Sequence, residues 1–139
     1  MLIGEYQHNI DPKGRVFMPA HFRETLGEHF IVTKGLDDCL FVYSLTEWQG
    51  VEEKIRSLPL SKARNLQRFF FAGAADVSAD KQGRVLLPQN LRDYAGIVKD
   101  VMVIGASNRV EIWDKDKWDA NCSSITPQSI AEAMDELGF

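Results

Sequence analysis

The sequence has only two cysteines, Cys39 and Cys122, and neither stands in a Cys-x-x-Cys or other zinc-type spacing. This scarcity argues against a disulfide framework and favours a thiol-reducing compartment. The three histidines, His8, His21 and His29, show no His-x-His or His-x-x-x-His relation, so we expect no metal site. No apolar run approaches the roughly 18 residues of a membrane span, and the amino-terminal residues do not resemble a signal peptide. We therefore expect a cytoplasmic protein that does not enter a membrane.

Enzyme motifs are missing as well. The chain has no Gly-x-Ser-x-Gly, His-Glu-x-x-His, P-loop or Gly-x-Gly-x-x-Gly element. Aspartates are plentiful, but no two of them have a spacing that nominates the pair for acid–base catalysis. We therefore predict that the protein is not an enzyme, has no catalytic residue and needs no cofactor.

Charge is unevenly distributed along the chain, although the formal net charge is only −4. Residues 111–139 hold seven acidic and two basic residues, whereas residues 54–68 hold five basic residues and no acidic one. The distribution of charge, rather than its sum, sets the field that a partner meets. The acidic balance argues mildly against nucleic-acid binding without excluding it. The basic stretch is a solvated helix face, a subunit contact or a supplementary phosphate contact.

What the chain does contain is a long internal repeat. Residues 11–27 (DPKGRVFMPAHFRETLG) return 69 positions later as residues 80–96 (DKQGRVLLPQNLRDYAG), and seven of the seventeen aligned residues are identical. After one inserted residue the correspondence continues, so that Trp48 matches Trp118. A repeat of this length decides the architecture, because each copy is one structural unit that cannot bury its apolar face alone.

Each repeat is expected to begin with a β-hairpin whose turn is built by the identical aspartate and glycine. The aspartate accepts a hydrogen bond from a backbone N–H two residues further on, and the glycine closes the turn. We therefore interpret Asp11, Gly14, Asp80 and Gly83 as turn-forming residues.

Arg15 and Arg84 follow the two turns, and arginine is a costly choice for a purely structural position. Its planar guanidinium suits phosphates and the edges of guanine bases. We predict that both arginines contact DNA and that Lys13 and Lys81 add phosphate contacts. Two such hairpins, related by a twofold, would form a surface that reads a groove of DNA.

Short helices are expected to start at Pro19 and Pro88 and to end at the following glycines. Arg23 and Arg92 fall on the polar side of these helices. For these two arginines an accessory DNA contact and a solvated or ion-paired role are about equally supported.

The repeat predicts the order β-β-α-β-β-α for each half. We expect a first repeat over 1–58, a linker helix over 59–72, a second repeat over 73–121 and a C-terminal helical tail over 122–139. Thr46 and Asp114 are expected to cap the helices that carry the two repeated tryptophans. A single half would leave strand edges open, so we expect an α+β fold in which the halves interlock about a pseudo-twofold axis as a closed, barrel-like unit.

The chain resembles the MraZ family of bacterial transcriptional regulators in six segments: DPKGRVFMP, DKQGRVLLP, GEYQHNI, LFVYSLTEW, RFFFAGA and RVEIWDKDKW. The resemblance covers roughly residues 1–120. It implies tandem SpoVT-AbrB-like swapped-hairpin domains within one chain, and a homo-oligomeric ring of about eight subunits. The motif residues of the family fall on Asp11, Arg15, Asp80 and Arg84.

The resemblance also implies a sequence-specific regulator, typically a repressor, that is associated with the nucleoid. Such a protein binds short G-rich repeats in double-stranded promoter DNA, in front of its own division and cell-wall gene cluster. One departure is visible, because the second turn has Lys81-Gln82 where the first has Pro12-Lys13. This departure leaves open whether Lys13 and Lys81 play equivalent roles.

The alternative function is a ring-forming protein-interaction scaffold that does not bind DNA. It would use the apolar segment Phe69–Phe71, whose three side chains cannot all point the same way on a helix. At least one of them is expected to face the other half or another subunit. The two functions differ in whether promoter DNA is bound with a steep dependence on salt.

Overall fold

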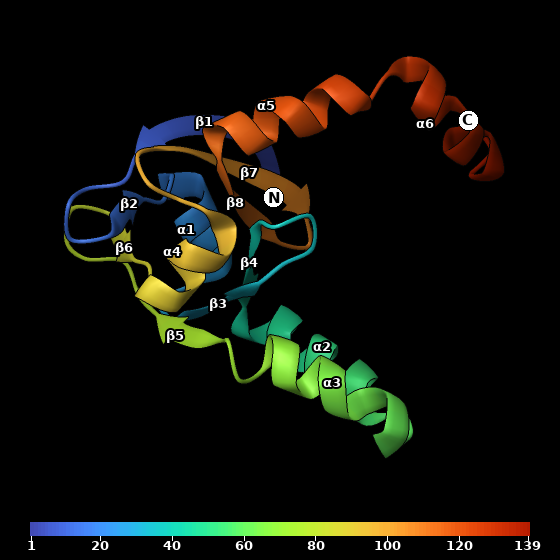
Figure 1. The fold of residues 1–139 in the computed structure, drawn as a ribbon, viewed down its shortest axis with the longest axis horizontal. Helices are drawn as coiled ribbons and strands as arrows, with labels where there is room; N and C mark the ends of the chain where they lie inside the picture. Colours follow the sequence, from blue (N-terminus) through green and yellow to red (C-terminus); the bar gives the residue numbers. More distant parts are fainter.

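The computed structural model describes all 139 residues and shows an antiparallel sheet with six helices, of which two pairs project as arms (Figure 1). The first repeat forms β1 (Leu2–Asn9), β2 (Arg15–Phe17), α1 (Ala20–Leu26), β3 (Phe30–Lys34), β4 (Leu40–Ser44) and α2 (Leu45–Arg56). After α3 (Leu60–Phe70), the second repeat forms β5 (Ala75–Val77), β6 (Arg84–Leu86), α4 (Gln89–Ala95), β7 (Asp100–Ser107), β8 (Val110–Asp114) and α5 (Lys115–Ser124). The last helix is α6 (Pro127–Glu136). The predicted α+β class and the β-β-α-β-β-α order are confirmed.

The two repeats exchange strands. The main sheet has the order β1-β7-β8-β4-β3-β5, so the first strand of each repeat pairs with the third strand of the other. All of these pairs are antiparallel, and β4 pairs with β8 where the repeats meet. The sheet is nevertheless open, because β1 and β5 each have one neighbour, and β2 and β6 pair only with each other. The strand pairings therefore do not close the barrel that we expected.

The main sheet is covered on both faces, which explains the long apolar runs in its central strands. On one face a core of 18 buried residues includes Val16 and Val85 from the short strands and Phe22 and Leu91 from the helices α1 and α4. On the other face a second core of eight buried residues includes Trp48 of α2, and side chains of α2, α3 and α5 pack against it. Strands buried on both sides read as continuous rather than alternating hydrophobic segments.

The capping residue of α2 differs from the prediction. Ser44, not Thr46, accepts a hydrogen bond from the backbone N–H of Glu47 at 3.2 Å. The helix follows β4 without a loop, so the last residue of the strand is already in the extended conformation that a cap requires. Asp114 caps α5 as predicted, because its carboxylate accepts from the backbone N–H of Lys117.

The segment Phe69–Phe71 contributes to both repeats. Phe70 and Phe71 pack against the outer core, and Phe71 lies edge-on to Trp48. Phe69 lies edge-on to Tyr94 of the second repeat. The expectation that at least one of these rings faces the other half is confirmed. None of the helices has the length and apolar character needed to cross a membrane.

Candidate nucleic-acid interface

The two repeated turns lie side by side at one end of the molecule, where β2 and β6 pair (Figure 1). In this antiparallel pair Val16 is opposite Val85. The backbone N–H of Met18 donates to the carbonyl oxygen of Gly83 at 2.9 Å, and the N–H of Leu87 donates to that of Gly14 at 2.9 Å. Each turn is therefore held by the strand end of the other repeat, and the two turns form one unit.

Each aspartate builds its turn and also holds the arginine that follows. Oδ1 of Asp11 accepts from the backbone N–H groups of Lys13 and Arg15 at 3.0 and 2.8 Å, and Oδ2 accepts from Nε of Arg15 at 2.7 Å. Asp80 binds the backbone of Gln82 and Arg84 in the same way, and its Oδ2 is 3.2 Å from Nε of Arg84. Each aspartate holds the arginine of its own turn through Nε, not through the terminal nitrogens.

The two arginines are half-buried but not equivalent. The terminal nitrogens of Arg15 have no hydrogen-bond or ion-pair partner within the chain, whereas Nη1 of Arg84 lies 3.6 Å from Oδ2 of Asp11. Arg84 thus bridges both turn aspartates, and Arg15 pairs with Asp11 only. Arg15 consequently has the freer guanidinium.

The turn carboxylates make the paired turns sensitive to acid. Backbone hydrogen bonds from Arg15 and Arg84 are the main cause that lowers the pKa values of Asp11 and Asp80. A lowered pKa in the folded state stabilises the fold above the unfolded value of about 4, and this stabilisation is lost as the pH falls through the folded value. We expect the unfolding free energy to decrease more steeply below about pH 4 than in a doubly substituted Asp11→Asn, Asp80→Asn protein.

Urea unfolding followed at pH 7, 5, 4 and 3 would measure this difference. Asp38→Asn provides the control, because Asp38 is exposed and its positive φ of 60° is a conformation that asparagine tolerates. The control should keep the profile of the unsubstituted protein. An identical profile for the double Asp→Asn variant would show that the turn carboxylates do not set the acid sensitivity.

Arg23 and Arg92 lie beneath the turn of the opposite repeat. Nε of Arg23 donates to the carbonyl of Met18 at 3.0 Å, and Nε of Arg92 donates to that of Leu87 at 2.9 Å. A Cβ atom at Gly14 would come within 2.6 Å of Cζ of Arg92. Both arginines are half-buried, so they support the turns sterically while part of each guanidinium stays accessible. The sequence placed Arg23 and Arg92 on the polar side of the short helices, but it did not predict that they pack beneath the turns.

Lys13 and Lys81 are both exposed on the turns but occupy different places. The backbone N–H of Gln82 donates to Asp80 as that of Lys13 donates to Asp11. Gln82 is therefore the structural counterpart of Lys13, and Lys81 corresponds to Pro12. From the sequence we set Gln82 opposite Lys13 but did not propose Gln82 as a contact residue. A glutamine amide at this place is suited to the edge of an adenine base.

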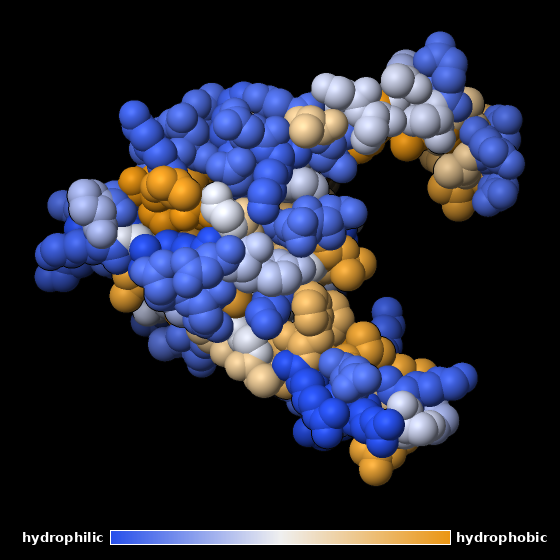
Figure 2. Space-filling view, in the orientation of Figure 1, coloured by the Kyte–Doolittle hydropathy of each residue, from blue (hydrophilic) through white to orange (hydrophobic).

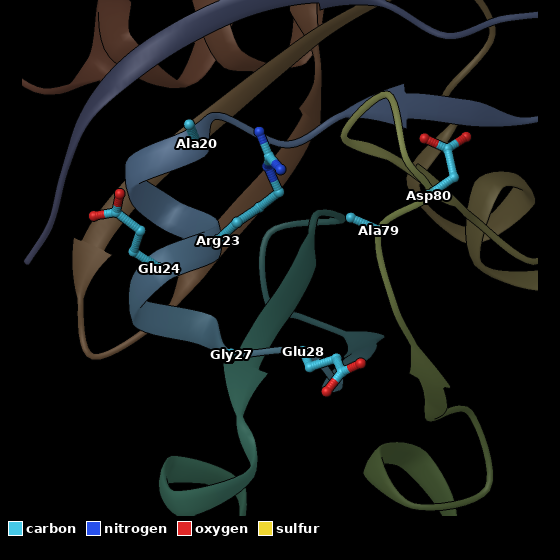
Figure 3. A pocket seen from close by; sticks show the side chains of 7 residues that line it. All are labelled: Ala20, Arg23, Glu24, Gly27, Glu28, Ala79 and Asp80. Carbon is cyan, nitrogen blue, oxygen red and sulfur yellow. The ribbon is translucent and has the colours of Figure 1, made fainter.

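A groove of about 460 Å³ lies beside the second turn, between α1 and the segment before β6 (Figure 3). Its lining residues are Ala20, Arg23, Glu24, Gly27, Glu28, Ala79 and Asp80. Three carboxylates surround a single guanidinium, a balance that disfavours phosphate, and no group of three acidic, histidine or cysteine residues is placed to hold a metal ion. This groove is therefore a poor match for a phosphate backbone, whereas the exposed edge of the turns carries Lys13 and Lys81.

Comparison with known proteins shows the family to which the chain belongs. The family model described as "MraZ protein, putative antitoxin-like" matches the chain twice, over residues 1–69 and 70–137. The chain is 59% identical to the transcriptional regulator MraZ of Acetivibrio thermocellus, 57% identical to that of Clostridium acetobutylicum and 56% identical to that of Caldicellulosiruptor bescii. Each alignment covers 100% of both proteins. The two family matches and the full-length identities show that the chain belongs to the MraZ family.

Proposed function

We propose that the protein is a sequence-specific DNA-binding transcriptional regulator and that the paired turns are its DNA contact. The observation that carries the proposal is the placement of Arg15 and Arg84 on adjoining turns, each oriented through Nε by its own aspartate. Pre-oriented guanidinium groups lose little freedom on binding and suit bidentate contacts. The relatives that carry the name transcriptional regulator support the same function.

The paired turns have the chemistry of a β-ribbon reader. A two-stranded ribbon fits the major groove of B-form DNA, where arginine makes bidentate hydrogen bonds to O6 and N7 of guanine. Arg15 and Arg84 would read guanines, and the exposed Lys13 and Lys81 would bind phosphates. This assignment agrees with the short G-rich promoter repeats that the family resemblance implies. Accessory contacts from Arg23 and Arg92 remain part of the proposal.

The proposal extends to the biological setting and to assembly. We propose regulation, typically repression, of the division and cell-wall gene cluster that contains the protein's own gene, in the cytoplasm at the nucleoid. Tandem swapped-hairpin domains of the AbrB type, with repeats at 1–58 and 73–121, would form a ring of about eight chains. Several weak sites that engage successive DNA repeats gain affinity from effective concentration, which offsets the acidic charge of each chain.

Fluorescence anisotropy with DNA from upstream of the protein's own gene tests the function directly. If each chain neutralises about four phosphates, affinity should fall about 150-fold when salt rises fourfold. Scrambled DNA of the same length and composition is the control and should bind more weakly at both salt concentrations. Failure to bind the upstream DNA even at the lower salt concentration would contradict the proposal and favour the protein-interaction scaffold.

A further inference from the structure

The outward face of the short β2–β6 ribbon carries two apolar side chains as well as the two arginines. In the antiparallel register Arg15 is opposite Leu86, and Arg84 is opposite Phe17. Residues that are directly opposite in such a pair point to the same face, and alternate residues along a strand point to opposite faces. The valine pair between them is completely buried in the core. The other four side chains therefore lie on the face that is turned away from the core.

Phe17 is already engaged within the chain. Its ring lies edge-on to that of His8, with the ring centroids 5.1 Å apart, and Cζ of Arg23 lies 5.7 Å from the centroid of the Phe17 ring. A Cβ atom at Gly83 would come within 2.8 Å of Cε2 of Phe17. The ring therefore packs on the second turn and supports it.

Leu86 is the counterpart of Phe17 at the offset of 69 residues, but it is 54% exposed. The end of the molecule that carries the paired turns is largely hydrophilic on the face shown in Figure 2, with small hydrophobic areas. A single leucine among polar neighbours offers far less apolar area than the roughly 800 Å² that each partner buries in a stable protein interface. Its surface instead suits a ligand group of the size of one methyl.

The position of Leu86 beside Arg15 indicates which methyl group this is. The Cβ atoms of opposite residues in a strand pair lie about 4.5–5.5 Å apart, and successive base pairs of B-form DNA lie about 3.4 Å apart. When the guanidinium of Arg15 binds O6 and N7 of a guanine, Leu86 is within reach of the next base pair. Among the four bases only thymine presents a methyl group in the major groove, where apolar side chains contact it.

We infer that Leu86 contacts the C5-methyl group of a thymine in the base pair next to the guanine that Arg15 reads. This contact rests on the proposed function and adds a second base to it. The side of the ribbon with Arg15 and Leu86 reads guanine and thymine together, whereas Arg84 reads guanine alone, because Phe17 beside it packs on its own turn. Each chain therefore reads one thymine methyl group, and its recognition of DNA is asymmetric.

Replacement of thymine by uracil tests the contact, because uracil pairs with adenine in the same way and lacks only the methyl group. Each thymine of the upstream duplex is replaced in turn, and the affinity of the full-length protein is measured by fluorescence anisotropy. At the contacted position the affinity should fall about fourfold, the value for losing one buried methyl-sized group. The sensitive thymine should neighbour a guanine whose replacement by 7-deazaguanine weakens binding by the unsubstituted protein but not by Arg15→Ala.

Variants of Leu86 assign the effect to this side chain. Leu86→Ala should bind the thymine duplex about fourfold more weakly and should bind thymine and uracil at that position equally. Leu86→Met keeps the apolar area and should keep the preference for thymine. Leu36→Ala is the matched control, because Leu36 is 60% exposed and lies between β3 and β4, away from the paired turns (Figure 1). This control should bind both duplexes as the unsubstituted protein does.

Two results would overturn the contact and leave the DNA-binding function in place. One is a thymine preference that survives in Leu86→Ala, and the other is equal affinity for thymine and uracil at every position. A leucine that wedges between base pairs would give the second result, with Leu86→Ala weakening binding to both duplexes alike. Failure of the unsubstituted protein to bind the upstream duplex would instead refute the proposed function, and the contact with it.

Discussion

Arg15→Ala should lower the affinity for upstream DNA by about 10- to 100-fold, since one bidentate contact to a base contributes about 1–3 kcal/mol. The terminal nitrogens of Arg15 have no partner in the chain, so their hydrogen-bonding capacity is available to the DNA. Fold stability should change by less than about 1 kcal/mol, because the pair with Asp11 is only partly buried. Anisotropy titrations and thermal unfolding of the same preparation measure both quantities.

Arg15→Lys separates base reading from simple charge. Lysine keeps the positive charge but lacks the planar fork that binds two acceptors at once. Affinity for the upstream sequence should therefore remain low, whereas affinity for scrambled DNA should be nearly restored. Arg56→Ala is the matched control, because it removes one positive charge from the exposed arm far from the turns. Normal binding of upstream DNA by Arg15→Ala would remove Arg15 from the proposed interface.

Arg84→Ala is expected to affect DNA binding differently from Arg15→Ala. Arg84 bridges Asp80 and Asp11, so its loss leaves two carboxylates without this shared cation at the proposed DNA surface. The variant should lose specific and non-specific binding together, because Asp11 keeps its pair with Arg15 but Asp80 is left unpaired, and an unpaired carboxylate repels every phosphate backbone. This contrast would show that the two hairpins contribute unequally, as the asymmetry of their ion pairs suggests.

Local features of the fold were predictable because each strand, turn and helix of the repeat occurs twice, so two sequences predict the same element. The turn built by Asp11 and Gly14 has the expected hydrogen bonds, and the order of strands and helices is as expected. Strand partners were not fully predictable. The exchange of β1 and β5 between repeats depends on contacts more than 40 residues apart, and β2 and β6 pair with each other instead of joining the main sheet.

The parts of the candidate site that the sequence could not show are tertiary contacts. Arg92 packs against Gly14 of the other repeat, and no spacing along the chain encodes such a neighbour. Ser44 replaced Thr46 as a cap because the strand runs into the helix without a loop. Gln82 differs from these two cases, because the offset of 69 residues between the repeats aligns it with Lys13. From the sequence we aligned these two turns but assigned no DNA contact to Gln82.

Gly105→Ala should destabilise the fold by about 1–3 kcal/mol, because a methyl group has no room at this position. Gly105 lies in β7 opposite Gly4 of β1, and a Cβ atom there would come within 2.4 Å of the backbone carbon of Leu2 and 2.5 Å of the nitrogen of Ile3. Backbone atoms cannot rotate away as a side chain can, so β1 itself must move. Glycine in a strand commonly marks such a close approach of two backbones.

The consequence should extend from stability to DNA binding. β1 pairs with β7 from Leu2 to Asn9 and leads directly into the turn at Asp11, so a displaced β1 carries the first arginine-bearing turn with it. Thermal unfolding should show a lower midpoint for Gly105→Ala, and anisotropy should show weaker binding of upstream DNA. Gly50→Ala is the control, because no atom lies within 4 Å of its added Cβ and alanine favours the helix α2 by up to about 1 kcal/mol. If Gly105→Ala unfolds at the midpoint of the unsubstituted protein, β1 and β7 accommodate the added methyl group and the prediction is wrong.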